Sequence, residues 1–177
     1  MEAIPADFSG LDNTCDNIYC CHVPSRIHQE LKQTRPFRSI AEEASLTIVR
    51  TAAELEHTFA QALRPYDITP TQYNVLRILR GAGGQGLCRN EVGQRLIRQV
   101  PDVTRLLDRM EDLDLIARQR GDKDRRYVTT TITKKGLELL KRVDEKVDEI
   151  HRDQLGHMDA GRLQQLIKLL DTARHRT

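Results

Sequence analysis

The sequence predicts a mainly α-helical fold that contains one β-hairpin. Two observations support this class: apolar residues recur at helical spacing through most of the chain, and two neighbouring segments rich in Val, Ile, Thr and Tyr interrupt that pattern. A length of 177 residues suggests one domain, or one domain with an appendage. No apolar run approaches the roughly 18 residues of a membrane helix, and the N-terminus lacks a secretory signal. We therefore expect a cytoplasmic protein with no membrane partner.

Residues 1–39 differ from the rest of the chain. They hold three of the six prolines and three of the four cysteines, Cys15, Cys20 and Cys21, without a sustained period. We interpret them as an N-terminal extension that either docks on a neighbour or stays mobile. The crowded cysteines are unlike the distributed cysteines of a disulfide framework, which favours a reducing compartment.

A long helix is predicted over 40–63. Its apolar residues step by 4, 3, 4 and 3, the spacing of a heptad seam that packs on another helix, at Ile48, Ala52, Leu55, Phe59 and Ala62. Thr69, Pro70 and Gln72 then occupy the N-cap, N1 and N3 positions of a capping box. The helix that they start stops at Gly81, and we interpret the glycines that follow as a linker.

Two short helices and a hairpin come next. The first helix covers about 89–97, and the second begins at Pro101. The second helix has an apolar stripe formed by Val103, Leu106, Leu107, Met110 and Leu113. The β-prone segments 115–120 and 126–133 flank a polar turn at 121–125, which predicts the hairpin.

Two more helices close the chain. Thr133 caps the first of them and Asp159 caps the second. The apolar stripe of the first is Leu140, Val143, Val147 and Ile150. The residues expected on the inner face of the second are Leu163, Leu166, Ile167 and Leu170.

The charge of the chain is concentrated in one segment. The net charge is only +2, but residues 95–135 carry 11 basic and 7 acidic groups, and residues 116–135 carry 7 and 2. A local excess of +5 in a near-neutral chain suggests an element that binds a polyanion. Aromatic residues make up only 4%, too few for a surface that stacks single-stranded bases.

Two short helices joined by a tight turn and followed by a basic hairpin make a winged helix-turn-helix, here over 69–133. The second helix of the pair enters the major groove, where the edges of the bases differ, and hairpin arginines reach phosphates or the minor groove. A solvated charged face is the plainer interpretation of these residues, and Arg109 could instead pair with Asp108 or Asp112. The charge excess favours contact with double-stranded DNA. The candidate residues are Arg98, Gln99, Asp102, Thr104, Arg105, Arg109, Lys123, Asp124, Arg125 and Arg126.

Three runs, in order and at gap-free spacing, resemble the MarR-type (multiple antibiotic resistance regulator) winged-helix repressors. Residues 103–111 (VTRLLDRME) resemble the recognition helix of that family, and 122–128 (DKDRRYV) resemble its wing tip. Residues 132–136 (ITKKG) resemble the start of its long dimer helix. The resemblance covers roughly residues 40–175.

The resemblance implies a homodimer in which helices 40–63, 134–156 and 160–175 of both chains intertwine as a dimerisation region. The seam and the stripe described above are what such an interface needs. It also implies that Arg126 enters the minor groove and that Asp124 helps to hold it. The expected function is transcriptional regulation at a pseudo-palindromic operator. The family implies repression that ends when a small aromatic or anionic effector binds between the dimerisation and DNA-binding regions.

Two departures from the family pattern concern local structure. Cys88 stands where the family has a Ser or Thr N-cap, with Glu91 three residues on, so a weaker cap is expected. Asp114 stands where the family often has Gly after the recognition helix, and Asp tolerates a left-handed turn less well.

Other functions are less well supported. A thiol-based redox or metal-sensing regulator would use Cys15, Cys20 and Cys21 with His22, although their spacing is poor for zinc. A purely protein-binding helical module explains the helices but not the basic hairpin. No Ser-His-Asp triad, carboxylate pair or phosphate loop is present in the pattern, so we expect no enzyme, no metal site and no cofactor. No chemistry is assigned to four further histidines, His57, His151, His157 and His175.

Overall fold

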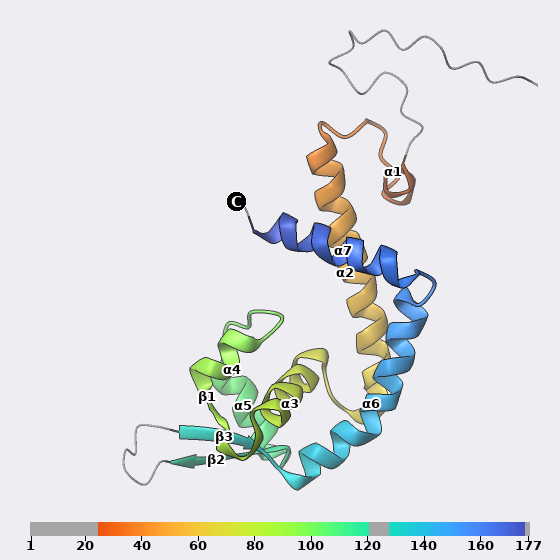
Figure 1. The fold of residues 1–177 in the computed structure, drawn as a ribbon. Helices are drawn as coiled ribbons and strands as arrows, with labels where there is room; N and C mark the ends of the chain where they lie inside the picture. Colours follow the sequence, from red (N-terminus) through yellow and green to blue (C-terminus); the bar gives the residue numbers. More distant parts are fainter. Residues whose placement is uncertain (1–24, 121–127, 176–177) are drawn as a thin grey trace, which may run out of the picture. The chain divides into compact units, whose positions relative to one another are not determined.

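The computed structural model describes residues 25–120 and 128–175 (Figure 1). It divides into two compact units between Thr51 and Ala52. The described part of the first unit holds the short helix α1 (Arg26–Glu30) and the beginning of α2 (Ile40–Leu63). Ile27 is buried there, and Glu30 forms an ion pair of 3.9 Å with Arg50. The helix α1 of the predicted extension therefore contacts α2 of the same chain.

The second unit contains the rest of α2 and the elements that follow it. In chain order these are the 3₁₀ turn Arg64–Tyr66, α3 (Pro70–Ala82), the 3₁₀ turn Gly83–Gln85, β1 (Leu87–Cys88), α4 (Arg89–Arg95), α5 (Val103–Asp112), β2 (Ile116–Arg120), β3 (Val128–Ile132), α6 (Lys134–Leu155) and α7 (Ala160–Arg174). The fold is mainly α with a winged helix-turn-helix, as the sequence predicts. The sheet, α3, α4 and α5 gather at the N-terminal end of α6 (Figure 1).

The predicted hairpin is confirmed, and it is joined by a strand that the sequence did not predict. β2 and β3 pair antiparallel, with Ile116 opposite Ile132 and Arg120 opposite Val128. The missed strand β1 pairs with the other side of β3, so the sheet order is β1-β3-β2. A two-residue strand is too short to show a period of two, which is why the pattern did not reveal it.

The helix starts follow their caps. The Thr69 capping box is confirmed: the Thr69 N–H donates to Gln72 Oε1 over 2.8 Å, and the Gln72 N–H donates to Thr69 Oγ1 over 3.2 Å. The sequence predicts that the second helix of the helix-turn-helix begins at Pro101, and this prediction is wrong. That helix, α5, begins at Val103, because the Asp102 carboxylate accepts the Arg105 N–H at 2.9 Å and makes Asp102 the N-cap.

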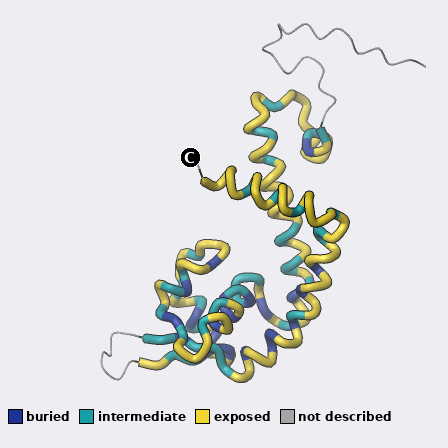
Figure 2. Tube along the Cα trace, viewed as in Figure 1, coloured by how far each residue is buried: buried dark blue, intermediate teal, exposed yellow. Residues whose placement is uncertain are grey.

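The core of the second unit lies between α3, α5, α6 and the sheet, where Figure 2 shows most of the buried positions. Its completely buried side chains include Leu76, Leu79, Met110, Leu140 and Val143. The apolar stripe of α6 is thus buried within a single chain, whereas the sequence analysis expected it to pack in a dimer interface. In contrast, α7 buries none of its residues.

The end of α5 has an unusual backbone conformation. Asp114 has φ of 57°, in the left-handed region. This is the position where the related family often has glycine. Its carbonyl oxygen accepts the Thr133 hydroxyl at 2.7 Å, and the Leu113 carbonyl accepts the Lys135 ammonium at 2.8 Å. The turn after α5 is therefore held by the residues that start α6.

Among the described residues, no helix is long and apolar enough to cross a lipid bilayer.

Candidate nucleic-acid interface

The N-terminal turn of α5 presents an exposed polar surface. Thr104 and Arg105 are both exposed on this turn, directly after the Asp102 cap. Arg89, the first residue of α4, donates from its guanidinium to Thr104 Oγ1 over 3.2 Å. These side chains border an open hollow of about 600 Å³ that is lined mainly by polar groups, including Asn90. Guanidinium and hydroxyl groups in this arrangement can bind phosphate oxygens or base edges.

Arg89 is a functional candidate that sequence reasoning missed. In the sequence Arg89 marks only the start of a helix, because its distance of 15 residues from Thr104 hides their contact. The signal that could have found it is general: in a helix-turn-helix the first helix crosses the phosphate backbone. A cation at its first residue is therefore a candidate for phosphate contact.

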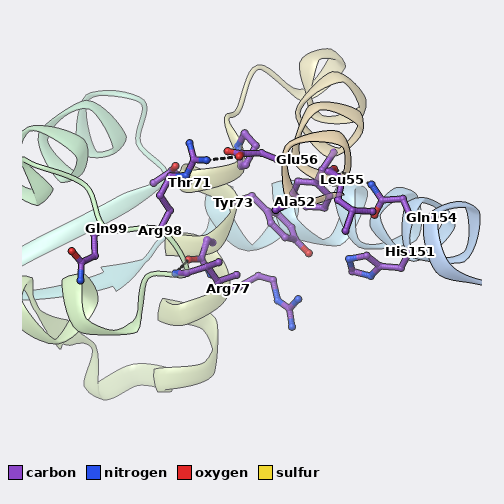
Figure 3. Close-up of a pocket in the computed structure, with 14 residues that line it drawn as sticks. Ala52, Leu55, Glu56, Thr71, Tyr73, Arg77, Arg98, Gln99, His151 and Gln154 are labelled. Carbon is purple, nitrogen blue, oxygen red and sulfur yellow. Dashed lines mark hydrogen bonds and ion pairs between the residues drawn. The ribbon is translucent and has the colours of Figure 1, made fainter. Parts of the chain in front are cut away.

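The turn between α4 and α5 carries Arg98 and Gln99, and their side chains point in opposite directions (Figure 3). The Arg98 guanidinium forms a short ion pair with the carboxylate of Glu56 on α2. Gln99 points away from Glu56 and also borders the hollow at the start of α5. The structure thus gives the Arg98 guanidinium a carboxylate partner that the sequence did not predict.

The other predicted residues fall into two groups. Arg109 is exposed on α5, one turn beyond Arg105, whereas its predicted alternative partner Asp108 pairs with Arg118 at 2.7 Å. Four lie outside the described residues, between the ends of β2 and β3: Lys123, Asp124, Arg125 and Arg126. The cysteines of the alternative hypothesis, Cys15, Cys20 and Cys21, also lie outside them.

Arg118 connects the wing, which is the hairpin of β2 and β3, to helix α5. Its guanidinium Nε donates to Glu111 Oε2 over 2.8 Å, and a terminal nitrogen reaches Asp108. The backbone N–H of Arg118 also donates to Glu111 Oε1, at 3.1 Å. With its side chain only 26% exposed, Arg118 is held on both sides, so strand β2 and helix α5 are fixed to one another.

The same contact shifts the titration of Glu111. The hydrogen bond from the Arg118 side chain lowers the pKa of Glu111 below its usual range, with a further contribution from the charge of Arg118. A lowered pKa in the folded state stabilises the fold above the unfolded-state pKa, and that stabilisation is lost as the pH falls through the folded-state value.

We expect Glu111→Gln to flatten the acid branch of the stability profile. In the parent protein the free energy of unfolding should fall more steeply between about pH 5 and 3 than in the variant, because only the parent must protonate this carboxylate. Urea unfolding followed by circular dichroism measures the difference. Glu138→Gln, at an exposed position of α6, is the matched control and should keep the parent profile. Parallel profiles for all three proteins would contradict the role given to Glu111.

A second cavity, of about 690 Å³, lies among α2, α3, α6 and the α4–α5 turn. One side is aromatic: the ring of Phe59 meets Tyr73 edge-on at 5.6 Å and stacks on His151 at 6.2 Å. Burial raises the pKa of the Tyr73 hydroxyl. The guanidinium carbon of Arg77 lies 5.9 Å from the centre of the Tyr73 ring. Arg98 and Glu56 also line the cavity (Figure 3). His151, to which the sequence assigned no chemistry, is thus part of a cavity wall.

Comparison with known proteins agrees with this geometry. The MarR family model matches residues 66–126. The homoprotocatechuate degradative operon repressor of Escherichia coli is 27% identical over 113 residues, which cover 64% of this chain and 75% of that protein. Among solved structures, a MarR transcription factor from Planctomyces limnophilus is 36% identical, with a TM-score of 0.60 and coverage of 77% of this chain and 98% of the other.

A solved complex with DNA has the same fold. The S. aureus MepR–DNA complex superposes with a TM-score of 0.67 at 25% identity, over 73% of this chain and 94% of that one. The similar proteins include one named as a repressor and one named as a transcription factor. The winged helix-turn-helix, the polar start of α5 and these similarities agree, and the chain belongs to the MarR family of transcriptional regulators.

Proposed function

We propose that this protein is a cytoplasmic homodimer that represses transcription at a pseudo-palindromic operator, releases DNA when a small molecule binds, and has no enzymatic activity. The observation that carries the proposal is the exposed start of α5, where Thr104 and Arg105 lie beside Arg89. Arg118 holds this helix against the wing strand, so both elements would meet the duplex in a fixed relation.

The predicted contacts divide by role. Gln99, Thr104 and Arg105 at the start of α5 are proposed to meet base edges and phosphates in the major groove. Lys123, Asp124, Arg125 and Arg126 of the wing are proposed from the sequence alone, with Arg126 in the minor groove.

Dimerisation is supported by the apolar surface left over within one chain. α7 buries no residue, and Ile167 and Leu169 on it are 59% and 62% exposed. On α2, Ile48 and Val49 are also exposed. Burying such side chains against a second chain gains hydrophobic free energy that one chain does not provide. Two chains related by a two-fold axis would read two half-sites of an inverted repeat.

Two observations support repression and the release of DNA by a small molecule. The relative from Escherichia coli is a repressor by name. The cavity that contains Tyr73, Phe59 and His151 has aromatic walls and two nearby guanidinium groups, which suits a small aromatic anion.

Selection of bound duplexes from random DNA, with the full-length protein, tests the proposal. We expect enrichment of an inverted repeat, and binding to it should weaken steeply as salt is added, because phosphate contacts release counter-ions. Analytical ultracentrifugation of the protein with the selected duplex should show two chains per site. No enrichment of an inverted repeat would overturn the proposed function.

A further inference from the structure

The side chain of Arg89 on α4 reaches across to the first turn of α5. Its Nη1 donates to the Thr104 hydroxyl oxygen over 3.2 Å, and its Nε and Nη2 donate to Asn90 Oδ1 over 3.3 and 3.1 Å. These three exposed residues border two hollows: the one of about 600 Å³ at the start of α5, and one of about 470 Å³ that extends to Arg118 on β2 and Thr130 on β3. The guanidinium is therefore held between the start of α5 and the wing strands.

The contacts of Arg89 leave part of its guanidinium available to a ligand. An arginine side chain has five N–H groups, and in the described part of the chain three of them are used, one on Nε, one on Nη1 and one on Nη2. One N–H remains on each terminal nitrogen, which is the pair that a bidentate contact needs. Asn90 and Thr104 offer neutral oxygens, so they orient the guanidinium without cancelling its charge. In contrast, Arg98 and Arg118 pair with carboxylates.

Two groups of a DNA duplex fit this pair of N–H groups, a phosphate and a guanine. Guanine presents two acceptors, O6 and N7, at its edge in the major groove. The place of Arg89 on α4 suits a phosphate, because the first helix of a helix-turn-helix crosses the backbone. Its hydrogen bond to Thr104, however, carries the guanidinium to the N-terminal turn of α5, the end of the recognition helix that approaches base edges. The position of the guanidinium therefore favours guanine.

We propose that Arg89 recognises one guanine in each half-site of the operator, and that Thr104 positions the guanidinium for this contact. The base-contacting surface then includes a residue of the first helix, 15 residues before the residue of α5 that holds it. This inference rests on the proposed function, since it needs α5 to enter the major groove. It goes beyond that function by naming the base, its acceptor atoms and the side chain that selects them.

Selection of bound duplexes with the full-length parent and with Arg89→Ala tests the choice of base. We expect parent sites to carry guanine at one position of each half-site, and Arg89→Ala to lose the preference at that position alone. Replacing this guanine in one half-site should weaken parent binding by about 5- to 150-fold and leave the binding of the variant unchanged. Arg95→Ala removes an equal charge from an exposed position of the same helix that borders neither hollow, and it should keep the guanine.

A modified base separates a guanine contact from a phosphate contact. In one half-site 7-deazaguanine removes the N7 acceptor, so parent binding measured by fluorescence anisotropy should weaken by about 2- to 12-fold, half of the free energy of the bidentate contact. Arg89→Ala should bind the modified and unmodified duplexes equally. Inosine at the same position removes only an amino group in the minor groove, and it should leave the ratio of parent to variant affinity unchanged.

Two variants of Thr104 test its positioning role. Thr104→Val keeps the shape of the side chain but removes the oxygen that accepts from Arg89, so the effect of 7-deazaguanine should shrink toward that in Arg89→Ala. Thr104→Ser retains the hydroxyl and should restore the effect to its size in the parent. A full effect of 7-deazaguanine in Thr104→Val would refute the positioning role.

Three results would overturn the guanine contact: an equal loss of affinity for all duplexes in Arg89→Ala, which would identify a phosphate contact; an unchanged guanine preference in that variant; or the same effect of 7-deazaguanine in the parent and the variant. A parent protein that enriches no inverted repeat would overturn the proposed function and this inference with it. An inverted repeat without a guanine that depends on Arg89 would overturn this inference alone.

Discussion

Replacing Arg126 by alanine is expected to weaken operator binding by roughly 150- to 25,000-fold at physiological salt. One charged hydrogen bond is lost from each protomer, so the proposed dimer loses two, and each contributes about 1.5–3 kcal/mol. The loss should be similar for the selected site and for unrelated duplexes, since the wing is proposed to read charge and groove shape more than base identity. Fluorescence anisotropy at several salt concentrations measures both affinity and salt dependence.

The salt dependence separates a DNA contact from a general charge effect. If both arginines neutralise phosphate charge, the slope of log K against log salt should become shallower by about 1.8 in the variant. Arg142→Ala removes an equal charge from an exposed position of α6 and should retain the parent slope. Unchanged affinity together with an unchanged slope in Arg126→Ala would refute the wing assignment.

The largest expected loss of stability belongs to Gly86→Ala. Gly86 has φ of 63°, where an alanine is strained by about 1–2 kcal/mol. An added Cβ would also lie 2.5 Å from the Thr130 carbonyl oxygen and 2.6 and 2.7 Å from the methyl groups of Thr129 and Thr131. Because these atoms belong to the central strand β3, they cannot move away without disturbing the sheet, which adds about 1–3 kcal/mol. Urea unfolding at equal protein concentration should therefore show a loss of about 2–5 kcal/mol.

Gly84→Ala is the matched control for this loss. An added Cβ at Gly84 meets no atom within 4 Å, and its backbone is not in the left-handed region. Its effect should stay within about 0.5 kcal/mol. If the two variants were equally stable, the close approach of Gly86 to β3 would not exist in solution.

Local signals predicted much of the fold. The capping box at Thr69 and the cap at Thr133 need only neighbours three residues away, and both are present in the structure. The periodicity likewise predicted α2, α6 and the hairpin. The start of α5 was placed two residues early because Pro101 is favourable at a first helical position, and the pattern could not show that Asp102 provides the cap.

What the sequence could not predict depends on contacts between distant residues. A stripe such as Leu140 and Val143 has the same spacing whether it packs inside one chain or against another, and only the structure shows that it is buried within one chain, where α6 contacts α3. The same limit hid the contacts of Arg89 with Thr104 and of Arg98 with Glu56. The sequence placed Arg98 with the DNA contacts, whereas the structure adds a carboxylate partner and a cavity beside it.

The exposed helix α7 has a consequence for the cell that carries this protein. A helix of 15 residues is marginal by itself, and α7 buries no side chain within its own chain. In the proposed dimer a second copy supplies the missing contacts, so the concentration of dimers able to hold an operator rises with the square of the chain concentration while dimers are scarce. Repression would then begin above a threshold copy number, and two daughter cells that inherit unequal numbers of chains would differ in gene expression.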